Sequence, residues 1–165
     1  MEKLTELKIQ KCIIAYLLNK TDGNWHEDKV RKTNLHAHGP DLVLIGGKRD
    51  SEHFIIECKG KSYARSANSI NKESWLVALG QLITRMNTNR VILRGKNKGK
   101  INRAYKYGLG LYRVGAQVAL RRIPNKIAKV LNLYIFSVDN DGFVRQWTPS
   151  QFGHFYSEKN FKRNK

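Results

Sequence analysis

The chain has 165 residues and a hydrophobic fraction of 41%, which suits a single domain with a buried core and argues against disorder. Its 31 lysines and arginines outnumber 13 aspartates and glutamates and give a formal net charge of +18 at pH 7, which predicts a polyanionic partner, above all nucleic acid. No apolar run approaches the ~18 residues of a membrane span, and no basic amphipathic helix with an aromatic face stands out, so we expect no membrane partner.

The cysteines and the first residues bear on the compartment. Cys12 and Cys58 both lie in apolar segments and are expected to stay reduced. The opening residues MEKLTELKIQ lack the apolar centre of a signal peptide. We therefore expect a cytoplasmic, intracellular protein.

The first predicted element is a helix over residues 2–19, whose apolar residues form two overlapping stripes. A helix with such stripes is buried over much of its circumference. Glu6 lies two turns before Ile13 on nearly the same face, so this acid leans towards the interior. The simpler interpretation of Glu6 is a first-turn glutamate favoured by the helix dipole. The stripes comprise Leu4, Leu7, Ile14 and Leu18, and Ile9, Ile13 and Leu17.

Residues 30–38 are predicted to form an edge strand that leads to Asp41. Its alternation places His36 and His38 on one face. A zinc site of both histidines and Asp41 lacks a fourth ligand at a typical spacing. Histidines beside a phosphate-binding site are the favoured interpretation, with His38 in a supporting role.

The stretch 39–60 is predicted to be a hairpin, with strands over 41–45 and 53–59 and a polar turn between them. The simplest antiparallel register places Leu42 opposite Ile56 and Asp41 opposite Glu57. Directly opposed side chains lie about 5 Å apart, where two carboxylates repel each other and require a cation.

Lys59 lies on the same sheet face as Glu57, whereas Cys58 points to the other face. Asp41, Glu57 and Lys59 therefore converge, which suits a hard divalent ion and an anionic substrate. The alternative is a structural salt bridge in which Lys59 neutralises one acid. That alternative leaves the other carboxylate unpaired, at a cost of several kcal/mol when buried.

Residues 61–72 are rich in Ser, Asn and Lys and are predicted to form a loop beside this site. A helix is expected over 72–86, with Gln81 either near the site or partly exposed. A short strand follows over 90–94. Two strands, a helix and a further strand predict an α/β sandwich, with the helix packed over the sheet.

The most basic part of the chain follows. From Ser74 to Val138 there are 13 lysines and arginines and no acid. Such a block requires a counter-charge, and phosphates would give salt-sensitive affinity. Tyr105, Tyr107 and Tyr112 would stack on unpaired bases or, as we favour, pack against a helix. The predicted nucleic-acid contacts are Lys61, Arg65, Arg94, Lys96, Lys98, Lys100, Arg103, Arg121 and Arg122.

The last third of the chain is predicted to be a basic helical region and a β-hairpin. Residues 107–120 alternate glycine with apolar residues and favour a loop that becomes a helix near Leu111. A basic turn over 125–131 precedes strands 133–138 and 143–147. The tail from Pro149 carries Phe152, Phe155 and Phe161, which would dock on the domain.

Pro40-Asp41 followed by Glu57-Cys58-Lys59 resembles the motif of the PD-(D/E)xK nuclease superfamily, which includes restriction endonucleases and archaeal-type Holliday junction resolvases. The resemblance covers about residues 1–93. It implies a restriction-endonuclease-like core, a mixed β-sheet flanked by helices, as the first part of one nuclease domain over 1–165. A basic helical and hairpin extension (94–150) and a tail (151–165) follow.

The resemblance also implies roles for these residues. Asp41, Glu57 and the Cys58 carbonyl would bind Mg²⁺, or Mn²⁺ in its place, and Lys59 would position the attacking water. Glu6 resembles a third acid contributed by the first helix. Gln81 resembles a polar residue that some exonuclease subgroups follow four residues later with tyrosine, whereas position 85 here is Arg85.

The resulting hypothesis is a metal-dependent DNA endonuclease. The small size and basic face resemble a structure-specific enzyme such as a junction resolvase more than a sequence-reading restriction endonuclease. Cleavage of two strands would suit a homodimer. The alternatives are a non-catalytic nucleic-acid-binding module with a nuclease fold, and a basic component of a nucleoprotein assembly whose hairpin is only core.

Overall fold

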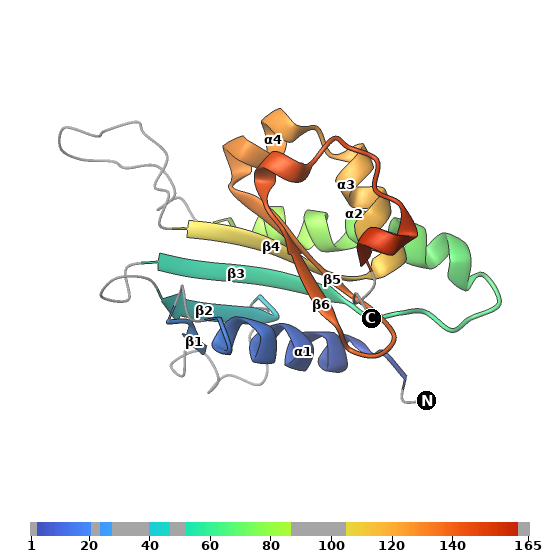
Figure 1. Ribbon diagram of the computed structural model, residues 1–165, viewed down its shortest axis with the longest axis horizontal. Coiled ribbons are helices and arrows are strands. Elements are labelled where there is room, and N and C mark those ends of the chain that lie inside the picture. The colour runs from blue at the N-terminus through green and yellow to red at the C-terminus, as the bar shows by residue number, and fades with distance from the viewer. Residues whose placement is uncertain (1–2, 21–23, 28–39, 47–51, 87–104, 162–165) are drawn as a thin grey trace.

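The structure is a computed structural model that describes residues 3–20, 24–27, 40–46, 52–86 and 105–161 (Figure 1). The helices are α1 (Glu6–Leu18), α2 (Ala67–Thr84), α3 (Arg113–Arg122) and α4 (Asn125–Leu131). The strands are β1 (His26–Glu27), β2 (Leu42–Gly46), β3 (Glu52–Lys59), β4 (Tyr105–Tyr112), β5 (Leu133–Val138) and β6 (Val144–Trp147). Two 3₁₀ turns follow, η4 (Pro149–Gln151) and η5 (Glu158–Phe161).

The six strands form one mixed sheet in the order β1-β2-β3-β4-β5-β6. β4 is parallel to both of its neighbours, β3 and β5, and the other pairs are antiparallel. Strands β4, β5 and β6 thus extend the same sheet as the β2–β3 hairpin. The predicted α/β class with a mixed sheet flanked by helices is confirmed.

Helices cover both faces of the sheet (Figure 1). On one face, Ile9, Ile13 and Leu17 of α1 pack on a layer that includes Phe54 and Cys58. On the other face, α2, α3 and α4 pack on the side chains that alternate with these. Neighbouring residues of β3 therefore face different helices, so Cys58 faces α1 and Glu57 faces the α2 side.

The predicted register of the β2–β3 hairpin is confirmed. Leu42 pairs with Ile56, Val43 with Ile55 and Leu44 with Phe54. The alternation of apolar side chains fixes this register, because a slip of one residue would turn every side chain to the wrong face.

The predicted loop from Tyr107 to a helix start near Leu111 was wrong, because helix α3 begins at Arg113 and the central strand β4 runs through this segment to Tyr112. Its glycines mark close packing. A Cβ on Gly110 would lie 2.6 Å from both Cys58 Sγ and Ile13 Cδ1, and one on Gly108 would lie 3.0 Å from Phe136. Glycine therefore occupies the α1 face of β4, where α1 and aromatic rings leave no room, and larger residues occupy the opposite face.

Two further boundaries differ from the prediction. α2 begins at Ala67, inside the predicted loop, because the buried Asn71 amide pairs with the backbone of Ser62 and gives the first turns a tertiary anchor. Residues 125–131 form helix α4 in place of a turn, with Asn132 ending it in the left-handed conformation at φ 49°. The predicted strands over 30–38 and 90–94 lie outside the described residues.

The tail docks through two of its three phenylalanines. Phe152 and Phe161 are buried in the core beneath α3 and α4, whereas Phe155 is 72% exposed. Among the described residues, no helix is long and apolar enough to cross a membrane.

Candidate functional site

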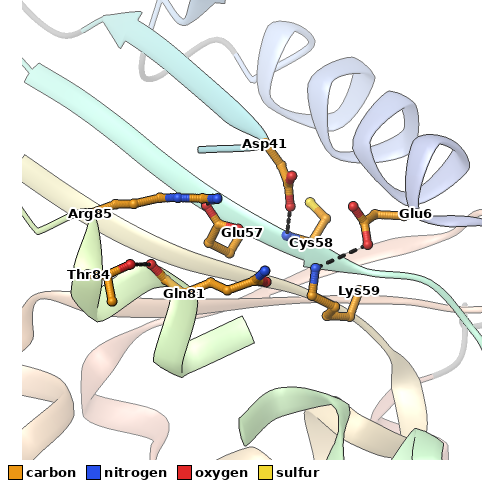
Figure 2. A network of polar contacts seen from close by, with 8 residues as sticks. All are labelled: Glu6, Asp41, Glu57, Cys58, Lys59, Gln81, Thr84 and Arg85. Carbon is orange, nitrogen blue, oxygen red and sulfur yellow. Dashed lines mark hydrogen bonds and ion pairs between the residues drawn. The ribbon is translucent and has the colours of Figure 1, made fainter. Parts of the chain in front are cut away.

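The predicted site residues gather where β2 begins and β3 ends, between α1 and α2 (Figure 2). Asp41 directly precedes β2, while Glu57, Cys58 and Lys59 close β3. The hairpin register brings these segments together, and the two helices add residues from distant parts of the chain.

Asp41 is anchored to β3. The backbone N–H of Cys58 donates a hydrogen bond of 2.6 Å to Asp41 Oδ2. This bond holds the half-buried Asp41 carboxylate beside Cys58, the residue that follows Glu57 in β3. It also satisfies the N–H of Cys58, which lies in β3 beyond the first residue of β2.

Glu57 is fully buried, at 0% exposed, on the face covered by α2. Arg85, the residue that caps α2, forms an ion pair with Glu57 through Nη1 and Oε1. No hydrogen-bond donor of the described residues reaches the second oxygen, Oε2. The cation that compensates Glu57 is therefore Arg85, and Lys59, the partner that we expected, pairs elsewhere.

Lys59 pairs with Glu6, with 3.2 Å between Nζ and Oε2 (Figure 2). The side chains are 20% and 43% exposed, so solvent screens this pair more than the Arg85–Glu57 pair. Glu6 reaches the site through Lys59, although its side chain is too exposed to be the interior acid that the helix pattern predicted.

Gln81 of α2 extends into the same space (Figure 2). Its Oε1 atom is buried, and no described donor bonds to it. Gln81 therefore lies beside the strand end that carries Glu57 and Lys59. Two oxygens without a donor, Glu57 Oε2 and Gln81 Oε1, come from different elements within this region.

The Cys58 thiol belongs to the opposite face. Burial, with added repulsion from the Asp41 and Glu6 carboxylates, raises the pKa of this thiol well above its usual value. The thiol therefore stays protonated at neutral pH and is a core side chain, without the thiolate that a nucleophile requires.

Gly60 lets the start of α1 approach the end of β3. A Cβ at this position would lie 2.6 Å from the backbone nitrogen of Glu6 and 3.0 Å from the Thr5 carbonyl carbon. The backbone N–H of Lys61 donates to the Leu4 carbonyl at 2.9 Å. Gly60 therefore permits the contact that brings Glu6 to Lys59.

Replacement of Gly60 by alanine is expected to lower the free energy of unfolding by about 1–3 kcal/mol, because the start of α1 must move away. Urea denaturation measures this loss. Gly80→Ala is the matched control, since a Cβ there meets nothing within 4 Å and the helix interior should gain about 0.5–1 kcal/mol. Equal stability of Gly60→Ala and the wild type would contradict this account of the α1 contact.

The predicted nucleic-acid contacts are spread over the surface. Lys61 lies two residues after the end of β3, and Arg65 is exposed in the segment that leads to α2. Arg121 and Arg122 are exposed at the far end of α3, about 13 Å along the helix from its start at Arg113. His38, Arg94, Lys96, Lys98, Lys100 and Arg103 lie outside the described residues.

Sequence reasoning gave no structural role to Arg85. Its only signal was its place four residues after Gln81, hence one turn further along the same helix face. In the described part of the chain, no three His, Cys, Asp or Glu side chains are grouped to hold a metal ion. The carboxylates that could bind one are Asp41 and Glu57, with Gln81 as a neutral oxygen donor.

Comparison with protein-family models, with curated proteins and with solved structures found no match.

Proposed function

We propose that this protein is a metal-dependent DNA endonuclease with a restriction-endonuclease-like core. The observation that carries the proposal is the fully buried Glu57, whose Oε2 lacks a donor from the described residues, at the strand end that also holds Asp41 and Lys59. A purely structural acid would be expected to have both oxygens satisfied, because an unpaired buried oxygen costs free energy.

The donor chemistry fits magnesium. Carboxylate and amide oxygens suit a hard divalent cation, and Asp41, Glu57 and Gln81 offer such oxygens without a thiolate or imidazole. The residues that would hold Mg²⁺ or Mn²⁺ are therefore Asp41 and Glu57, with the Cys58 carbonyl as the resemblance implies. When bound, the ion supplies a Lewis acid for the phosphate and lowers the pKa of water.

The protein side chains supply position and charge. Asp41 is held by the Cys58 N–H, so its carboxylate has a fixed place beside β3. The Lys59 ammonium lies at the same strand end and would orient water and offset negative charge on the phosphate. Its ion pair with Glu6 holds the Lys59 ammonium at this strand end.

The net charge of +18 supports DNA as the substrate, because a polyanion is attracted over the whole surface. A structure-specific enzyme is the preferred form of the proposal, and a restriction endonuclease the second. The competing function is a binding module without cleavage. The Arg85–Glu57 ion pair favours this binding module, because Arg85 neutralises the Glu57 carboxylate without a metal.

Cleavage of labelled DNA with Mg²⁺, Mn²⁺ or EDTA tests the proposal. The panel contains duplex, single strand, flap, four-way junction and plasmid. Asp41→Asn is the best variant, since the amide oxygen can still accept from the Cys58 N–H while the charge is lost. Metal-dependent cutting by the wild type and none by Asp41→Asn is expected. Tight binding without cutting in every metal would overturn the nuclease and support the binding module.

A further inference from the structure

Tyr63 is the tyrosine that the fold leaves exposed. Its relative exposure is 50%, whereas Tyr107 and Tyr112, two of those considered for base stacking, are at 0% and 6%. The third, Tyr105, is half-buried and stacks on His53. Of the seven tyrosines, all of which the structure describes, Tyr63 is the one with an exposed side chain.

The Tyr63 ring is held in place. The backbone N–H of Leu4 donates to the Tyr63 hydroxyl at 2.6 Å, and the preceding Ser62 is bound on both backbone atoms by the Asn71 amide, at 2.7 and 3.1 Å. A side chain anchored at its tip and at its backbone loses little entropy when a ligand packs on it. The exposed ring is therefore preorganised.

The ammonium groups of two lysines lie near this ring. Lys3 Nζ lies 5.9 Å and Lys61 Nζ 5.2 Å from the ring centroid. Cations at this distance interact with the π face and can also bind phosphate oxygens. An exposed aromatic ring with lysines nearby is a combination that binds single-stranded nucleic acid, through base stacking and backbone charge.

The ring is connected to the candidate site. Leu4, which binds the Tyr63 hydroxyl, is two residues from Glu6, and Glu6 pairs with Lys59. In the other direction, only residues 60–62 separate Lys59 from Tyr63. A nucleic-acid strand with a phosphate bound at Lys59 would therefore pass Tyr63 within a short length of the nucleic-acid backbone.

We propose that Tyr63, with Lys3 and Lys61 beside it, is a stacking surface for an unpaired nucleotide beside the cleaved phosphate. The proposal deepens the proposed function and rests on it for the place of the phosphate. In an intact duplex both faces of a base are stacked on neighbours, so the ring selects a single strand, a flap or a branch over a blunt duplex. The sequence of the bases is not read, because every base has a π face.

Binding in EDTA tests this inference without cleavage. We would measure the affinity of wild type, Tyr63→Leu and Tyr63→Phe for a fluorescent single strand and for a blunt duplex of equal length. Tyr63→Leu should lose about 5- to 100-fold in single-strand affinity and less than twofold in duplex affinity. Tyr63→Phe keeps the ring and should lie closer to the wild type on the single strand.

Two further readouts keep the test decisive. A 2-aminopurine base in the single strand should be quenched by the wild type and recover in Tyr63→Leu. The dependence of affinity on salt should keep its slope in Tyr63→Leu and lose about one unit in Lys61→Gln, since only lysine releases counterions. Equal losses on single strand and duplex, no loss on either, or no quenching by the wild type would overturn the inference. Cleavage by the wild type would still support the nuclease in those cases.

Discussion

Replacement of Arg85 by glutamine is expected to lower the free energy of unfolding by about 3–5 kcal/mol, because it leaves the buried Glu57 carboxylate without its cation. Glu57 is 1% and Arg85 21% exposed in their side chains, so water cannot replace the lost charge. Urea denaturation of the wild type and Arg85→Gln measures the difference.

The double variant Glu57→Gln/Arg85→Gln separates charge from packing. It removes both charges and keeps nearly the same side-chain volumes, so it should be more stable than Arg85→Gln alone. Arg65→Gln is the matched surface control and should change stability by less than about 0.5 kcal/mol. A loss below about 1 kcal/mol in Arg85→Gln would show that the Glu57 charge is compensated in another way.

The same ion pair bears on the metal. Arg85 and a divalent ion are two ways to neutralise Glu57, so a bound ion would compete with the guanidinium for the charge of the same carboxylate. In the Arg85→Gln background, Mg²⁺ should therefore raise the midpoint of thermal unfolding more than it does in the wild type.

Replacement of Lys59 by methionine is expected to reduce the rate of DNA cleavage by about 10²–10³-fold while DNA affinity changes little, because one ammonium among 31 basic residues contributes little to binding but acts at the phosphate. Methionine keeps an unbranched side chain of similar length. Single-turnover cleavage and equilibrium binding, measured on the preferred substrate of the panel, give the two quantities.

Glu6→Gln is the control for this change. It removes the charge of the Lys59 partner, which is 43% exposed, and should slow cleavage by less than tenfold if Lys59 is the group that acts on the phosphate. Equal losses in Glu6→Gln and Lys59→Met would instead mean that the pair acts as a unit. Unchanged cleavage in Lys59→Met would remove Lys59 from the proposed mechanism.

The two predictions probe different properties of one strand end. Arg85 compensates Glu57 from α2, whereas Glu6 compensates Lys59 from α1. The two charges at the end of β3 are thus balanced by residues of two different helices. A variant that lowers stability without affecting single-turnover cleavage, or the reverse, would assign the two pairs to separate roles.

Local sequence was sufficient for the hairpin. The turn length and the alternation of apolar residues fixed the pairing of Leu42 with Ile56, and with it the nearness of Asp41 and Glu57. The terminal β5–β6 hairpin was predictable for the same reason. In both hairpins the paired residues are close in the chain, so the alternation of apolar side chains is enough to predict the register.

The strand β4 was not predicted, although its period-two alternation of Gly108 and Gly110 with leucine was visible. Glycine is also typical of loops, and a glycine in a loop differs from one in a closely packed strand only in what packs against it. Here the neighbours are Ile13 of α1 and Cys58 of β3, which lie far away in sequence. Local propensity could not distinguish a strand from a loop here, because the contacts that decide between them come from residues far away in sequence.

The sequence by itself therefore determined that Asp41, Glu57 and Lys59 share one strand end in an α/β protein of high positive charge. Only the tertiary structure decided which cation faces which acid. Lys59 is nearer to Glu57 in sequence, but Arg85 pairs with it, because α2 covers the buried face of β3 and brings the guanidinium there. Charge partners depend on how helices cross a sheet, and that geometry arises from the packing of the whole core.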